Sequence, residues 1–157
     1  MTYSQRLKQM SPTELAVEYH TKQLEERESK LHDPDEDRQV LLGDMMDHEQ
    51  ALELLHSLDD WKSSGDYEWL LETYDERDGV TADMPVHRAM LIYYQKKTES
   101  VEDRIESGEY TRVHDVLMIT DYLTDNYKAM AVLQSLANPQ ELLNMRLWLM
   151  RDLLSKM

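Results

Sequence analysis

Histidines and carboxylates are the side chains of this 157-residue sequence whose types and spacing could support chemistry. Asp44 precedes His48 by four residues, and Glu53 precedes His56 by three, so each pair lies on one face of a helix. Carboxylate and imidazole groups at such spacings bind metal ions, and Glu-x-x-His is the spacing of di-iron helical bundles. A carboxylate–histidine metalloprotein is therefore one function to weigh.

The rest of the sequence does not complete such a site. A di-iron bundle needs two Glu-x-x-His motifs and two further glutamates, and no other histidine here has an acid three residues before it. The four histidines without ligand-like spacing are interpreted as structural: His20, His32, His87 and His114. The sequence thus predicts no metal and no cofactor, and leaves His48 and the Glu53/His56 pair open as ligands.

Nucleophilic and nucleotide chemistry have less support. The chain has no cysteine, which excludes disulfides, thiolate metal sites and cysteine nucleophiles. It has no Gly-x-Ser-x-Gly turn, no Gly-Lys-Ser/Thr phosphate loop and no Gly-x-Gly-x-x-Gly fingerprint. We predict that the protein is not an enzyme and nominate no catalytic residue.

The carboxylates are concentrated in one third of the chain. Residues 33–83 contain 17 Asp and Glu against only Arg38, Lys62 and Arg77, a net charge of −14 out of −15 for the whole chain. Concentrated like charge repels itself and lowers folding stability, so its presence points to solubility, a bound cation or a basic partner. Solubility would be served equally well by acids spread over the whole chain.

We interpret residues 33–83, the acidic segment, as a docking surface for a basic partner. Carboxylates along a helix can imitate nucleic-acid phosphates, and their attraction to a basic protein weakens in salt. The most concrete prediction is an inhibitor or modulator of a nucleic-acid-binding protein, of the kind that phages and mobile elements encode. The alternative is an acidic surface that is only solvated. The candidate partner-binding residues are Asp33, Asp35, Glu36, Asp37, Asp44, Asp47, Glu49, Glu53, Asp59, Asp60, Asp66, Glu68, Glu72, Asp75 and Glu76.

Four aromatic residues of the acidic segment, Trp61, Tyr67, Trp69 and Tyr74, could anchor a partner or belong to the core. The negative charge argues against direct binding to nucleic acid or anionic lipid, which requires basic surface. No apolar run is long enough for a membrane span or signal peptide, so we expect a cytoplasmic protein.

The elements that must position these residues are marked by proline and glycine. The tetrapeptides Ser-Pro-Thr-Glu, Asp-Pro-Asp-Glu and Asn-Pro-Gln-Glu each place a capping residue before proline and a glutamate two positions after it, which is typical of a helix start. They predict helices that begin at Pro12, Pro34 and Pro139. Glycine often supplies the left-handed residue that follows a helix. Helix ends are therefore predicted at Gly65, Gly79 and Gly108.

No segment alternates with period two, so the sequence predicts an all-α fold. The expected architecture is one domain, residues 1–157, built as a compact bundle of about six helices joined by short turns. The predicted helices span residues 12–31, 34–62, 66–77, 84–106, 109–136 and 139–155, with room for an extra turn before residue 10. In the second of these, Leu41, Met45, His48, Leu52 and Leu55 recur at three- and four-residue steps and form the predicted buried face.

The last helix is unusually apolar, with nine apolar residues among the thirteen from Leu142 to Leu154. A helix that is apolar on most sides is either wrapped by its neighbours or buried in a second subunit. Residues 142–154 therefore predict either a central helix or a surface for homo-oligomerisation. A self-associating helical scaffold or assembly protein is the alternative function.

Overall fold

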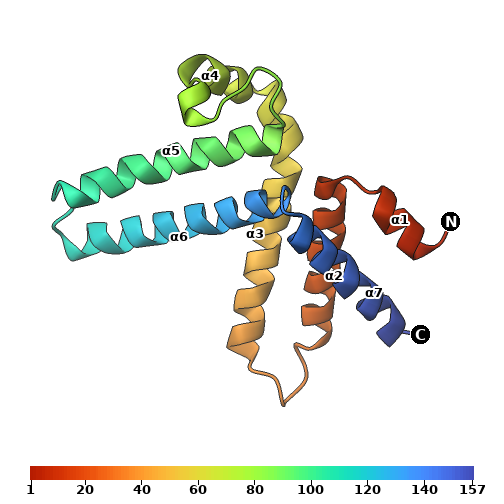
Figure 1. Ribbon diagram of the computed structural model, residues 1–157. Coiled ribbons are helices and arrows are strands. Elements are labelled where there is room, and N and C mark those ends of the chain that lie inside the picture. Colours follow the sequence, from red (N-terminus) through yellow and green to blue (C-terminus); the bar gives the residue numbers. More distant parts are fainter. The chain divides into compact units, whose positions relative to one another are not determined.

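The computed structural model describes residues 1–157 and contains seven α-helices, one short 3-10 helix and no strand. The all-α class is confirmed, with seven α-helices in place of about six (Figure 1). None of them is long and apolar enough to cross a membrane. The helices are α1 (Tyr3–Gln9), α2 (Pro12–Ser29), α3 (Arg38–Ser63), α4 (Asp66–Thr73), the 3-10 helix η1 (Glu76–Asp78), α5 (Val86–Glu106), α6 (Val113–Ser135) and α7 (Pro139–Ser155).

Two of the three predicted proline starts are confirmed. The Ser11 hydroxyl accepts a hydrogen bond from the Glu14 backbone N–H at 3.2 Å, and the Glu14 carboxylate accepts one from the Ser11 N–H at 3.3 Å. The side-chain oxygen of Asn138 accepts from the backbone N–H groups of Gln140 and Glu141. These bonds satisfy free amides in the first turns of α2 and α7, where a proline at the first helical position loses nothing.

The predicted start at Pro34 is wrong, because α3 begins at Arg38. The Asp33 carboxylate accepts the backbone N–H of Asp35 at 2.9 Å, which closes a local turn instead of capping a helix. Asp37 caps the helix instead: its carboxylate accepts the N–H groups of Gln39 and Val40. The two possible capping residues, Asp33 and Asp37, lie four residues apart. The helix starts after Asp37, which is the one closer to the apolar residues that α3 buries.

The other boundaries differ by a few residues. The third predicted helix divides into α4 and η1, and the fourth begins at Val86, directly after Pro85. The fifth begins at Val113, four residues later than predicted. All three glycines predicted to be left-handed have positive φ, at 90° for Gly65, 91° for Gly79 and 77° for Gly108.

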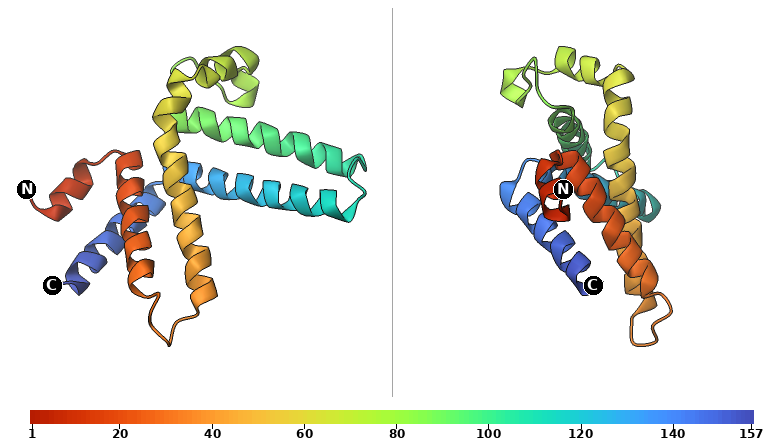
Figure 2. Two further views of the ribbon diagram at one scale, coloured as in Figure 1. Left: turned by 180° about the vertical axis from the view of Figure 1, so that it is seen from behind. Right: turned by 90° about the vertical axis from the view of Figure 1, so that its right-hand side faces the viewer.

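The chain forms two compact units, and the first contains residues 1–57 and 135–157. Within it α7 packs along α2 and touches α1, so the two ends of the sequence meet in one unit (Figure 1). The view from behind shows the same pairing of α2 with α7 (Figure 2). Its core contains Leu7, Leu15, Ala16, Leu41, Ala51, Leu55, Met145 and Leu149.

The second unit contains residues 58–134. In it α4 packs against α5, and a short turn joins α5 to α6 in a helical hairpin (Figures 1 and 2). Its core contains Leu58, Trp61, Leu70, Val80, Met84, Ala89, Met90, Ile92, Val101 and Leu133. The prediction that the chain is one domain and one compact bundle stays a prediction.

Candidate functional site: an acidic surface with an exposed tryptophan

The fifteen nominated carboxylates lie at the surface, as hydration of charge requires. Fourteen of them are exposed and Asp44 is half-buried. Eight belong to the first unit, within residues 33–53, and seven to the second, within residues 59–76. The structure therefore places an acidic group in each unit.

In the first unit the acids begin in the turn between α2 and α3. Asp33, Asp35, Glu36 and Asp37 are all exposed there. The carboxylates of Asp33 and Asp37 accept backbone N–H groups and so hold the turn and the start of α3. This turn is a local structure made largely of acidic residues.

The acids of α3 lie on two sides of the helix. Glu49 and Glu53 are one turn apart and exposed. Asp44 and Asp47 act on His48, where they partly oppose the lowering of its pKa by burial and by Arg27. From Asp44 to Glu53 the helix advances about 14 Å, which gives roughly one carboxylate for every 4.5 Å. One strand of duplex DNA carries a charge about every 3.4 Å along the axis, so the linear charge density is similar.

In the second unit, helix α4 combines acids with an aromatic side chain. Asp66, Glu68 and Glu72 are exposed, and Trp69 between them is 49% exposed. The Trp69 indole meets the rings of Tyr74 and Tyr93 edge to face, with centroids 6.2 and 6.5 Å apart. These contacts hold the indole on the surface in a fixed position.

The other nominated aromatic residues are less available to a partner. Trp61 is buried and contacts Tyr67 and Tyr93. The Tyr67 hydroxyl donates a hydrogen bond to the backbone carbonyl of Met84 at 2.7 Å, which ties α4 to the start of α5. The core interpretation is thus the better one for Trp61, whereas Trp69 is the exposed tryptophan of the acidic segment.

Few carboxylates of the acidic segment are neutralised by ion pairs within the chain. Asp75 pairs with Arg77 at 2.9 Å, and the hydrogen bond from Arg77 lowers the pKa of Asp75. Asp78 pairs with Lys96 at 2.7 Å, and this bond likewise lowers the pKa of Asp78. Among the acids that form no ion pair are Glu49, Glu53, Asp59, Asp60, Glu68 and Glu72. Their charges are left for solvent or for a partner.

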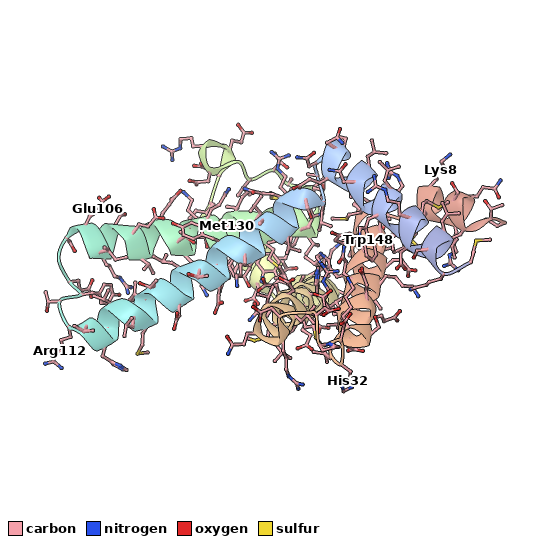
Figure 3. All side chains as sticks on the ribbon, turned by 90° about the horizontal axis from the view of Figure 1, so that it is seen from below. Lys8, His32, Glu106, Arg112, Met130 and Trp148 are labelled. Atoms are coloured by element: carbon pink, nitrogen blue, oxygen red, sulfur yellow. The ribbon has the colours of Figure 1, made fainter.

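A pair of histidines inside the first unit is a feature that the sequence did not indicate. The Nδ1 atoms of His20 on α2 and His48 on α3 lie 2.8 Å apart. Tyr19 stacks edge-on against His20 and also against Trp148 of α7; Figure 3 labels Trp148 on that helix. The pair therefore joins α2 to α3 beside an aromatic contact between α2 and α7.

This pair can hold only one proton between its two facing nitrogens. A hydrogen bond between two Nδ1 atoms needs one N–H donor and one lone pair, so both imidazoles cannot be protonated at once. Burial, with a smaller contribution from the neighbouring His48, lowers the pKa of His20 to about 4. The pKa of His48 is also lowered, first by burial and then by Arg27, while Asp44 and Asp47 oppose that shift. The pair is neutral at pH 7.

No single-sequence signal would have paired these histidines, because 28 residues separate them. The predicted face of α3 did place His48 beside buried positions, but its partner comes from another helix. His20, which the sequence predicts to be structural, is half-buried. The Asp44/His48 and Glu53/His56 pairs have no further ligands beside them. No group of three or more His, Asp or Glu side chains is placed to hold a metal ion.

The apolar last helix is buried on one side only. Met145 and Leu149 are in the core, whereas Leu143, Leu147 and Leu154 are 40%, 46% and 62% exposed. The central-helix interpretation of α7 is therefore wrong, since its neighbours α1 and α2 cover one face and leave the other open. An exposed leucine row is what a self-association surface would need.

Comparisons with known proteins do not assign this chain to a family. No protein-family model matches the sequence, and no curated protein or solved structure shows significant similarity to it.

Proposed function

We propose that this protein is a non-enzymatic binding protein whose acidic segment docks on a basic partner, most concretely a nucleic-acid-binding protein that it inhibits or modulates. The observation that carries the proposal is the exposure of fourteen of the fifteen nominated carboxylates, several of which, such as Glu49 and Glu68, form no ion pair. A basic groove built to hold phosphates would accept them at moderate salt and release them at high salt.

Trp69 strengthens the proposal because charge complementarity alone raises the association rate more than it raises the affinity. Binding hot spots are enriched in Trp, Tyr and Arg, and their energy comes from aromatic area removed from water. A partner arginine can lie over the indole face while it pairs with Glu68 or Glu72, which combines a cation–π contact with an ion pair. Trp69 is already held by Tyr74 and Tyr93, so little conformational entropy is lost on binding.

The test uses defined basic probes: fluorescently labelled deca-arginine and a panel of purified basic DNA-binding domains. Dissociation constants are measured by anisotropy between 50 and 300 mM salt, with duplex DNA as competitor. We expect at least one domain to bind with an affinity that falls steeply with salt, and duplex DNA to compete. The variant Glu49→Lys/Glu53→Lys and the variant Glu68→Lys/Glu72→Lys test the two units separately. Because these four residues form no ion pair, the substitutions remove no internal contact of that kind.

The matched control is Glu28→Lys/Asp125→Lys, which makes the same change of charge at exposed positions outside the acidic segment. Weaker binding and a flatter salt dependence in the acidic-segment variants alone support the proposal. Equal losses in the control mean that only net charge matters, and no binding by any basic probe at 50 mM salt rejects docking.

The exposed leucines of α7 favour a second candidate, a self-associating scaffold. Leu147→Glu places a charge in the exposed row, and sedimentation velocity then reports whether an oligomer dissociates. Leu149 is unsuitable for this test because it is 1% exposed and its substitution would disturb the core. A wild-type chain that stays monomeric at 100 μM excludes this candidate.

A further inference from the structure

The second unit contains a groove outside the acidic segment that none of the functions above uses. It has a volume of about 330 Å³ and lies in the α5–α6 hairpin. Lys97, Val101 and Arg104 line it from α5, and Ile119 and Tyr122 from α6. Tyr110 closes it from the connecting turn, whose ends are marked by Glu106 and Arg112 in Figure 3. Small-molecule sites in proteins begin at about this size.

The groove is basic in a strongly acidic protein. No carboxylate lines it, although the chain has 32 Asp and Glu residues. Lys97 and Arg104 are two turns apart on the same face of α5, about 10 Å along the helix axis. The acid that pairs with one of them, Glu109, lies 3.9 Å from the Arg104 Nε, and both side chains are more than half exposed. An exposed pair at this distance is weak, so it leaves the groove positive.

Tyr122 lines the groove together with both cations. The pKa of Lys97 is raised by its hydrogen bond with Tyr93, and Tyr122 adds to the effect. The pKa of Arg104 is raised by the bond that its guanidinium donates to the Tyr110 hydroxyl at 3.1 Å, and again Tyr122 adds to it. Because these residues line one groove, an anion bound there would meet two cations and tyrosine hydroxyl donors together.

Buried polar groups lie one helical turn from the groove. Thr98 precedes Val101 by three residues on α5, and Asn126 follows Tyr122 by four on α6. Both side chains are about 95% buried, and the Thr98 hydroxyl and the Asn126 amide nitrogen have no hydrogen-bond partner. Buried polar atoms are nearly always satisfied by protein, water or ligand. Neither residue lines the groove, so these two atoms are neighbours of the site and not part of it.

We propose that this groove binds a small organic anion, a phosphate ester or carboxylate whose charged oxygens meet Lys97, Arg104 and Tyr122. The apolar part of the ligand lies on Val101 and Ile119, the two aliphatic residues of the lining. A groove of this size with few polar contacts binds small ligands weakly, with a dissociation constant of roughly 1 mM for a ligand of ten heavy atoms. The site is independent of the proposed docking function, because it shares no residue with the acidic segment.

The experiment titrates the ¹⁵N-labelled full chain with phenyl phosphate at constant ionic strength and follows backbone amide shifts. Benzyl alcohol supplies a ring without charge, and inorganic phosphate supplies charge without a ring. We expect phenyl phosphate to shift amides around Lys97, Arg104 and Tyr122, with at least ten-fold tighter binding than either partial probe. Phenyl phosphate that binds no tighter than benzyl alcohol, or that shifts amides near basic residues throughout the chain, overturns the proposal.

Variants then assign the contacts. Lys97→Gln and Arg104→Gln should each weaken phenyl phosphate binding at least five-fold, whereas Arg112→Gln, an exposed basic residue outside the groove, should leave it unchanged. Both lining residues are exposed enough that their loss is tolerated by the fold, and the amide spectrum of each free variant checks this. Unchanged affinity in both lining variants overturns the proposal.

Discussion

Acidification from pH 7.5 to pH 5 should destabilise the first unit, because burial disfavours protonation of His20 and the His20–His48 contact does not allow both imidazoles to be protonated. The 2.8 Å contact between the two Nδ1 atoms requires a free lone pair. Protonation of both imidazoles would place two N–H groups, and two positive charges, against each other inside the unit. Arg27, which lowers the pKa of His48, adds a third positive charge, and Asp44 and Asp47 only partly offset it.

The magnitude follows from the pKa of His20. In the unfolded chain the imidazole titrates near its ordinary pKa of 6.5, and in the folded chain near 4. The unfolded state binds more protons between these values, so stability falls as the pH drops through this window and is level above and below it. At about 1.4 kcal/mol per pKa unit the full loss is about 3 kcal/mol, and about 2 kcal/mol is lost by pH 5. The lowered pKa of His48 acts in the same direction.

The assay is urea unfolding at pH 7.5, 6.5, 5.8 and 5, followed through the amide signals of the first unit. Because most carboxylates titrate below pH 5, this window isolates the histidines. His20→Gln removes one member of the pair, and the loss of stability with falling pH should become much smaller. His56→Gln is the matched control, since it removes an exposed histidine of α3 and should keep the wild-type slope.

Two results would refute the reasoning. One is a wild-type first unit that is as stable at pH 5 as at pH 7.5. The other is a His20→Gln variant that keeps the full slope. Direct titration of the imidazole signals provides a second check, because a His20 midpoint near 6.5 in the folded chain would contradict the burial on which the argument depends.

The remaining predictions concern stability and are measured by chemical denaturation. Leu149→Ala, at a position 1% exposed, should lower stability by about 3–5 kcal/mol because it leaves a cavity in the first unit. Thr98→Val should raise stability by about 1 kcal/mol, since it replaces a buried hydroxyl that has no partner with a methyl group; a loss would show that the hydroxyl is satisfied. Gly79→Ala should cost about 1–2 kcal/mol because φ is 91° there, whereas Gly43→Ala, inside α3 with open space around it, should gain about 1 kcal/mol. Equal effects at the two glycines would mean that the backbone angle does not decide the outcome.

The helices could be predicted from the sequence because their ends depend on local chemistry. Ser11 and Asn138 bond to amides two or three residues away, and the three left-handed glycines need only their own backbone. Where two local signals compete, as at Asp33 and Asp37, the outcome depends on which start suits the buried residues of α3. That choice involves packing, which a local pattern does not contain.

The features of the candidate sites also divide into those that the local sequence predicts and those that depend on the fold. Exposure of the carboxylates was predictable, because isolated charges stay hydrated. The position of Trp69 was not, since its neighbour Tyr93 lies on another helix. The His20–His48 contact and the α5–α6 groove likewise join residues that are distant in the sequence, and only the fold brings them together.

The acidic turn between α2 and α3 has a practical consequence for how the chain can be divided. Its residues are exposed and capped locally, and exposed polar turns are the preferred sites of proteolytic cleavage and of new chain ends. An endoprotease specific for acidic residues should cut first near Glu36. Fragment 1–36 would still be held by the packing of α2 on α7 and the ring contact of Tyr19 with Trp148. The first unit is therefore suited to reassembly from two separately produced pieces, residues 1–36 and 37–157.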